Sequence, residues 1–212
     1  MTIHWSLLVP GVVLLLFLAD RLLSRRVELR SFGCFHSLED SPRQRPWWWV
    51  PALWVDPLRG FVGTLLLREA FALKVTPWVP LPLGASALAL SILIAGILCQ
   101  MVTRRGGRGV LLAPMGFVAG AVLALAPWLV SLLAIATAAV GLFAFRQFHA
   151  FFTAGLMAIA LLGVALGADA AWIGAATGAF ALPLAAGLAT GSALELPTRN
   201  PSGPARSPLP LA

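Results

Sequence analysis

The sequence predicts an all-α membrane protein, a polytopic bundle of transmembrane helices with six clear spans and one poor or re-entrant helix over residues 57–78. Hydrophobic residues make up 59% of the chain and charged residues 11%, and the mean hydropathy is +0.90. Soluble domains contain roughly 25% charged residues. Several apolar runs approach the ~20 residues that cross a bilayer as a helix. Basic residues gather at the ends of these runs, as in cytoplasmic loops of membrane proteins.

Residues 1–23 are predicted to form an N-terminal transmembrane anchor. A secretory signal peptide carries its basic residues before the apolar stretch. Here no Lys or Arg precedes the apolar stretch, and Arg21, Arg25 and Arg26 follow it. The reversed charge order predicts an uncleaved anchor with its N-terminus outside and its C-terminal end in the cytoplasm.

Residues 24–56 are predicted to form a basic cytoplasmic loop that ends in a tryptophan-rich segment at the membrane surface. An indole ring has an apolar body and one N–H donor, so it favours the headgroup zone of a bilayer. A soluble aromatic core or a base-stacking platform would use similar residues, but this segment lies between apolar runs. The residues expected at the lipid interface here are Arg43, Arg45, Trp47, Trp48, Trp49 and Trp54.

The segment 57–78 either crosses the membrane or lies on its surface. Asp56 and Pro57 are a favourable helix start, and Glu69 falls on the apolar face of the helix that would follow. Crossing places nearly every Arg of the chain on one side, with only Lys74 near the outer end. Against crossing, one Arg at mid-membrane costs roughly 2.5–3.5 kcal/mol. The charge distribution favours seven spans.

Residues 79–192 are predicted to form a five-span bundle, and residues 193–212, rich in Pro and polar residues, a disordered tail. The loop after the first of these spans carries basic residues that are typical of sites for anionic lipid headgroups. The spans run approximately over 81–102, 110–126, 128–145, 150–167 and 172–191, and the basic loop residues are Arg104, Arg105 and Arg108.

Small residues at four-residue spacing predict close packing among the last four spans. In lipid, helices associate through close backbone approach across small residues, because lipid tails are as apolar as leucine. Pro114 and Pro183 are expected within spans and should bend them. The glycines expected to pack are Gly116, Gly120, Gly163, Gly167, Gly174 and Gly178.

Glu69 and Arg68 are the candidate intramembrane charges. An ionisable residue at membrane depth is usually functional. The alternative is that these residues are exposed at the surface or form a structural ion pair. Adjacent helical residues point about 100° apart, so the partners of these two would lie on other helices.

His149, among phenylalanines near a span end, is the candidate cofactor ligand, and a haem or chlorophyll-type pigment is the group it would hold. No second histidine lies at matching depth, which argues against a bis-histidine haem, and an interfacial histidine is the simpler interpretation. No cofactor is otherwise expected. Cys34 and His36 lack the second ligand pair that a zinc site requires.

No catalytic motif is evident, so no catalytic residue is assigned, and an enzyme is not the favoured class. The net charge is +7, but the basic residues do not form the continuous stripe that is typical of nucleic-acid-binding proteins. Membrane lipids and other membrane subunits are the expected partners. We expect an accessory subunit of a larger complex in a bacterial inner membrane, with its C-terminal tail in the cytoplasm. The alternatives are a small transporter for a neutral or lipidic solute, and an enzyme or pigment-binding subunit that uses Glu69, Arg68 or His149.

Overall fold

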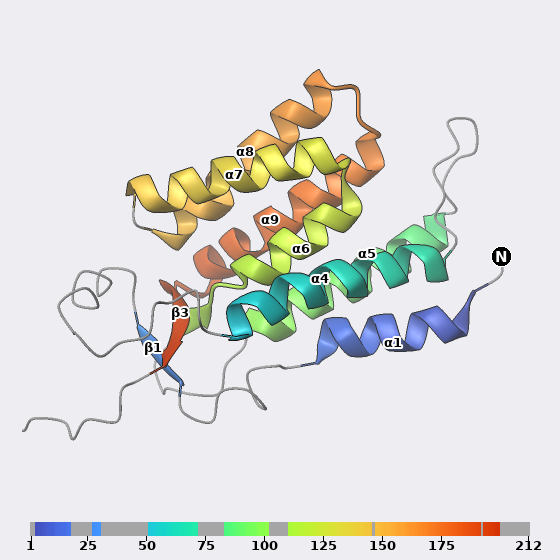
Figure 1. Cartoon of the computed structure of the whole chain (residues 1–212), viewed down its shortest axis with the longest axis horizontal. Helices are drawn as coiled ribbons and strands as arrows, with labels where there is room; N and C mark the ends of the chain where they lie inside the picture. The colour runs from blue at the N-terminus through green and yellow to red at the C-terminus, as the bar shows by residue number, and fades with distance from the viewer. Residues whose placement is uncertain are drawn as a thin grey trace, which may run out of the picture.

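The computed structural model describes residues 3–17, 27–30, 51–71, 83–101, 110–145, 147–191 and 193–199. Seven helices dominate these residues (Figure 1). In chain order the helices are α1 (Trp5–Leu16), α4 (Pro51–Ala70), α5 (Leu83–Met101), α6 (Met115–Leu125), α7 (Trp128–Phe145), α8 (Phe148–Ala165) and α9 (Ala170–Thr190). The predicted all-α class is therefore confirmed at the level of helical architecture.

Three short strands pair into a small sheet at one end of the helices (Figure 1). Strand β3 (Ala193–Arg199) is central, with β1 (Val27–Arg30) antiparallel to it and β2 (Val110–Leu112) parallel to it. Residues 193–199 were expected in a disordered tail, but they form β3. The rest of that tail lies outside the described residues.

Within the described residues, three helices are long and apolar enough to cross a membrane, not the six that the sequence predicted: α7, α8 and α9. Helices α1 and α6 have only 12 and 11 residues, about 18 and 16 Å at 1.5 Å per residue, whereas the hydrocarbon core is about 30 Å thick. Helix α4 has 20 residues but carries four charged side chains. An integral membrane location is supported by three helices.

Proline explains why α6 is short. Pro114 was expected to bend a span that began at residue 110. It instead precedes the first helical residue as the N-cap of α6, and residues 110–112 before it form β2. A helix commonly starts after proline because the ring has no N–H to donate. Pro183 does lie inside a helix, α9.

Helix α4 starts six residues earlier than expected, at Pro51 instead of Pro57, so that Pro57 lies inside it. Trp54 therefore belongs to the first turn of a helix rather than to a loop, and 66% of its surface is exposed. The other predicted interface residues, from Arg43 to Trp49 and from Arg104 to Arg108, lie outside the described residues.

The helices alternate in direction between two ends of the bundle. The backbone N–H of His4 donates to Ala70 O, while Arg59 reaches Phe17 O, so α1 runs antiparallel to α4. Helix α6 runs parallel to α4, because Gly60 lies against Phe117 and Arg68 against Ala124. The end that holds Phe17 and the start of α6 is called here the Arg59 end, and the opposite end the Arg68 end.

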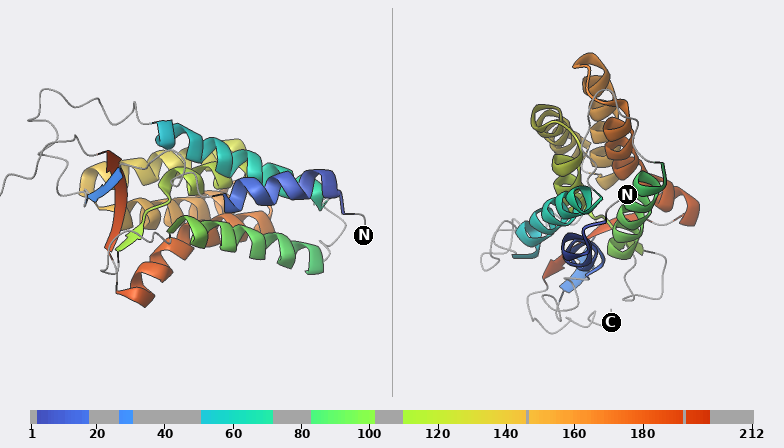
Figure 2. Two further views of the ribbon diagram at one scale, coloured as in Figure 1. Left: turned by 90° about the horizontal axis from the view of Figure 1, so that it is seen from below. Right: turned by 90° about the vertical axis from the view of Figure 1, so that its right-hand side faces the viewer.

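The buried core follows the helix pairs with the most extensive contacts, which are α4 with α6, α7 with α8, α1 with α4, and α8 with α9. These pairs lie side by side in Figures 1 and 2. Phe151, Phe152 and Phe180 fill the space between α8 and α9, with the rings of Phe151 and Phe152 edge to face at 5.2 Å. Aromatic pairs favour this geometry. The α8–α9 hairpin lies beside α6 through this core and brings the start of α9 to the Arg68 end.

Candidate functional site

Helix α4 carries two arginines, Arg59 and Arg68, whose side chains contact other helices. The candidate site residues lie around these two side chains. Arg59 is buried, with 5% of its surface exposed. Its Nη2 lies 3.2 Å from Asp56 Oδ1 and donates to Gln100 Oε1 at 2.7 Å. A buried guanidinium is stable only when it is paired and hydrogen-bonded. Asp56 and Gln100 meet that requirement for Arg59.

The same cluster closes the end of α1. Arg59 Nη1 donates to Phe17 O, and Gln100 Nε2 donates to Leu15 O at 3.2 Å and Phe17 O at 3.3 Å. The last carbonyls of a helix have no partner within the helix. Side chains of α4 and α5 therefore donate hydrogen bonds to the last carbonyl groups of α1. The cluster joins these three helices. It was not anticipated from the sequence, although Asp56 and Arg59 have the i, i+3 spacing of a helical ion pair.

Glycines bring both arginines of α4 close to α6. A Cβ on Gly60 would lie 2.3 Å from Phe117 O, and one on Gly120 would lie 1.9 Å from Pro57 O. No side chain fits at either position. The two backbones are therefore in near contact, and the Arg59 guanidinium lies 5.5 Å from the centre of the Phe117 ring.

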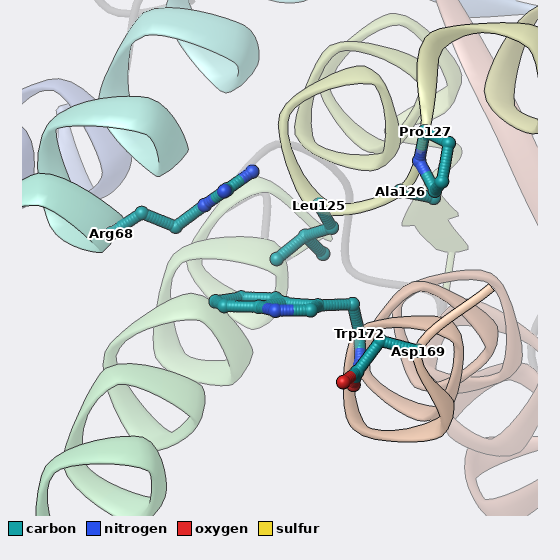
Figure 3. A pocket seen from close by; sticks show the side chains of 6 residues that line it. All are labelled: Arg68, Leu125, Ala126, Pro127, Asp169 and Trp172. Atoms are coloured by element: carbon teal, nitrogen blue, oxygen red, sulfur yellow. The ribbon is translucent and has the colours of Figure 1, made fainter. Parts of the chain in front are cut away.

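Arg68 lies at the other end of α4, in the wall of a pocket of about 240 Å³ (Figure 3). Its guanidinium carbon is 4.6 Å from the centre of the Trp172 ring, and its Nη1 donates to Ala124 O. Figure 3 shows the guanidinium over one face of the indole. The pocket is lined by Arg68, Leu125, Ala126, Pro127, Asp169 and Trp172.

Two buried donors beside this pocket have no hydrogen-bond partner within the described ranges, Arg68 Nε and Trp172 Nε1. Arg68 also forms no ion pair with any described carboxylate. Guanidinium and indole N–H groups only donate hydrogen bonds. The chemistry that this pocket offers is therefore recognition of an acceptor, not proton transfer.

Asp169 lines the pocket but is engaged elsewhere. Its Oδ1 accepts from the backbone N–H of Ala171 at 2.9 Å and of Trp172 at 3.4 Å, as the N-cap of α9. In Figure 3 its carboxylate lies on the opposite side of the indole from Arg68. A carboxylate at a helix N-terminus also interacts favourably with the helix dipole. Asp169 thus compensates α9 rather than Arg68.

The two predicted intramembrane charges lie in different environments. Arg68 is half-buried against α6 and α9, whereas Glu69 is exposed. Glu69 is therefore not buried against the described helices, although its spacing put it on the apolar face. Trp172, which stacks with Arg68, was not identified from the sequence. Its position in the first turn of a helix capped by Asp169 was the feature that could have indicated it.

The predicted cofactor ligand, His149, is half-buried in the first turn of α8. Cys34 and His36 lie outside the described residues. No group of three or more His, Cys, Asp or Glu side chains suited to a metal ion occurs in the described part of the chain. A haem or pigment at His149 stays a prediction.

The predicted packing glycines divide into three groups. Gly116 and Gly120 lie against α4, and Gly163 lies against α9, where a Cβ on it would be 2.7 Å from Cγ2 of Ile173. Gly167 instead forms the turn after α8, with a φ of 63° that glycine adopts without strain. Gly174 and Gly178 contact nothing within 4 Å of the Cβ that a larger residue would carry. Their expected partner is therefore not another described helix of this chain.

No protein-family model, curated protein or solved structure matches this chain.

Proposed function

We propose that this protein is a non-catalytic accessory subunit of a larger membrane protein complex, and that α9 provides the face on which a helix of another subunit docks. The observation that carries the proposal is the open position of Gly174 and Gly178 on a helix long and apolar enough to cross a membrane. These glycines have the four-residue spacing that allows two helix backbones to approach closely.

Further small residues are exposed along α9. At 100° per residue, Ala171, Ala185 and Ala189 share the side of Gly174 and Gly178, while Leu182 is half-buried between Gly178 and Ala185, and Leu188, 80% exposed, flanks this side. The part of the face around Gly174 and Gly178 gives lipid tails little surface to contact. It offers a partner helix close van der Waals contact instead, and this contact drives helix association in bilayers.

The exposed face of α7 has the opposite character and serves as an internal reference. Leu129, Leu132, Leu133, Val140 and Phe143 are all exposed there. Large apolar side chains are well solvated by lipid. Two helices of the same chain therefore differ in what they present, which supports a specific role for the α9 face rather than a general glycine and alanine bias.

The sidedness we propose follows from the alternating helix directions. Phe17, Met101 and β3 lie toward the Arg59 end, and the chain segments that continue from them contain most of the arginines of the sequence. The Arg68 end is followed by few basic residues. The positive-inside rule then puts the Arg59 end in the cytoplasm and the N-terminus outside. A bacterial inner membrane is the setting we propose.

The proposed docking face of α9 is tested by replacing its two exposed glycines with larger side chains. The full-length tagged chain is expressed in its native host and extracted in mild detergent, and the mass and composition of the purified species are measured. We expect stoichiometric partner subunits with the natural chain, and their loss with Gly174→Leu plus Gly178→Leu. Each leucine would keep two helix backbones several ångströms apart.

Ala136→Leu is the matched control, because Ala136 is a small exposed residue on the leucine-rich face of α7. This variant should retain its partners. A species that contains only copies of this chain, or the same partners with and without the α9 leucines, would contradict the proposal.

A further inference from the structure

We propose that the pocket between Arg68 and Trp172 binds an oxyanion, and specifically the phosphate group of an anionic phospholipid at the Arg68 end of the bundle. The site is independent of the α9 docking face, since Gly174 and Gly178 do not line it. Three observations carry the inference: the charge of Arg68, the unsatisfied donors beside it, and the position and size of the pocket.

The first observation is that Arg68 has no carboxylate partner among the described residues. Arg59, on the same helix, has the carboxylate of Asp56, the amide of Gln100 and a backbone carbonyl. Among the described residues, Arg68 has one backbone carbonyl and the face of an indole ring. Burying a guanidinium costs free energy unless it is paired and hydrogen-bonded, so a half-buried one without a described carboxylate favours the binding of an anion. Arg is the side chain that best matches phosphate geometry, because its N–H groups form a planar fork.

The second observation is the pair of donors that lack partners among the described residues, Arg68 Nε and Trp172 Nε1. Leaving a buried donor unsatisfied costs about 1–3 kcal/mol, so such groups call for an acceptor. A phosphate group has several acceptor oxygens and can serve the guanidinium fork and the indole N–H together. A neutral acceptor such as water could satisfy the donors but would not balance the charge.

The third observation is where the pocket lies. Helices α4 and α6 end there and α9 begins there, so the pocket lies at the level where spanning helices leave the hydrocarbon core. Its volume of about 240 Å³ is below the ~300–1,000 Å³ of pockets that enclose a whole small-molecule ligand. Leu125, Ala126 and Pro127 form an apolar wall beside the charge. A headgroup phosphate with its glycerol stem fits this combination of one polar and one apolar side.

The test measures binding of defined probes to the full chain in a neutral detergent by native mass spectrometry. Phosphatidylglycerol, phosphatidylcholine and inorganic phosphate are added in separate arms. We expect phosphatidylglycerol to bind with a first site that Arg68→Gln weakens at least about tenfold, the loss expected for a charge-assisted hydrogen-bonded contact. Arg68→Lys, which keeps the charge without the fork, should be weakened less.

Two control variants separate this site from general charge effects. Glu69→Gln alters the adjacent exposed charge without touching the pocket, and Arg199→Gln removes one positive charge at the end of β3, toward the opposite end of the bundle. Both should keep the first phosphatidylglycerol site. Trp172→Phe keeps an aromatic face but deletes the N–H, and should weaken the site about threefold or more, which tests the geometry even if Arg68→Gln lowers the yield of folded protein.

The arms also identify the source of the oxyanion. Binding of phosphatidylglycerol that depends on Arg68, with no binding of inorganic phosphate, supports the lipid. Binding of inorganic phosphate that depends on Arg68, without lipid binding, overturns the lipid and keeps the oxyanion. Equal binding by the natural chain, Arg68→Gln and Trp172→Phe in every arm overturns the site.

Discussion

Arg59 and Arg68 occupy the same helix, and their surroundings differ in a way that separates a structural arginine from a binding arginine. Arg59 is buried, and its charge and its donors are used by α1, α4 and α5. Arg68 is half-buried and stacks on Trp172 with one carbonyl as its acceptor. A charge that is paired with a carboxylate and shared among three helices holds the fold together. A charge that is partly partnered beside a pocket is available to a ligand.

The largest loss of stability is expected from disrupting the close contact between α4, which carries both arginines, and α6. Gly120→Leu puts a side chain where even a Cβ would lie 1.9 Å from Pro57 O and 2.8 Å from the backbone N of Phe61. Overpacking costs about 1–3 kcal/mol, and more where the obstacle is backbone, so we expect a loss of at least about 3 kcal/mol. Unfolding in mixed detergent micelles, followed by circular dichroism, measures it.

Gly174→Leu is the control for that variant, because nothing lies near the Cβ position there. The isolated chain should keep its stability with this change. Equal destabilisation by the two leucines would mean that α4 and α6 do not depend on close approach at Gly120.

The next effect separates the two arginines directly. Arg59→Met should destabilise the chain by about 3 kcal/mol, since removing one partner from a buried charged cluster leaves the other groups uncompensated. Arg68→Met should cost clearly less, because its only described protein acceptor is Ala124 O. The same detergent unfolding assay compares them. If Arg68→Met were the more damaging change, the division into a structural and a binding arginine would be wrong.

A smaller effect isolates the connection to α1. Gln100→Leu removes the acceptor of Arg59 and the donor to Leu15 O and Phe17 O, for which we expect about 1–3 kcal/mol. Hydrogen exchange of the last turn of α1 should accelerate in this variant more than exchange in α8. Uniform acceleration across both helices would contradict a local role for Gln100.

The smallest effect concerns Asp169. Asp169→Ala removes the N-cap of α9 and should cost about 1 kcal/mol. If Asp169 serves α9 and not Arg68, the variant leaves phosphatidylglycerol binding intact or strengthens it, because a nearby negative charge is lost. Asp169→Asn keeps a capping side chain and should restore most of the stability. Loss of lipid binding in both variants would assign Asp169 to the ligand site.

Much of the helical content was predictable from residue spacing, but the ends of the helices were not. Apolar runs located α7, α8 and α9 closely, since each is long and uninterrupted. Residues 110–114 are as apolar as those that follow, yet they form β2 and the cap of α6. Pro114 starts α6, and residues 110–112 before it pair with β3, which begins more than 80 residues later in the chain.

The candidate site was half predictable. Arg68 stood out because a charge in an apolar helix is costly, and this holds whatever surrounds it. Trp172 and Ala124, which give Arg68 its environment, come from α9 and α6, and no spacing within α4 indicates them. The same limit hid Arg59, whose partners Phe17 and Gln100 are 42 and 41 residues away in the chain.

The helical class, the membrane-like composition and the position of basic residues beside apolar runs could be predicted from the amino acids alone, because they depend on local composition and hydropathy. Which glycines lie in a helix contact, and which arginine is paired with a carboxylate and a glutamine, became evident only in the folded chain. Close approach and charge compensation are properties of pairs of groups. Those pairs exist only once helices distant in the chain lie side by side.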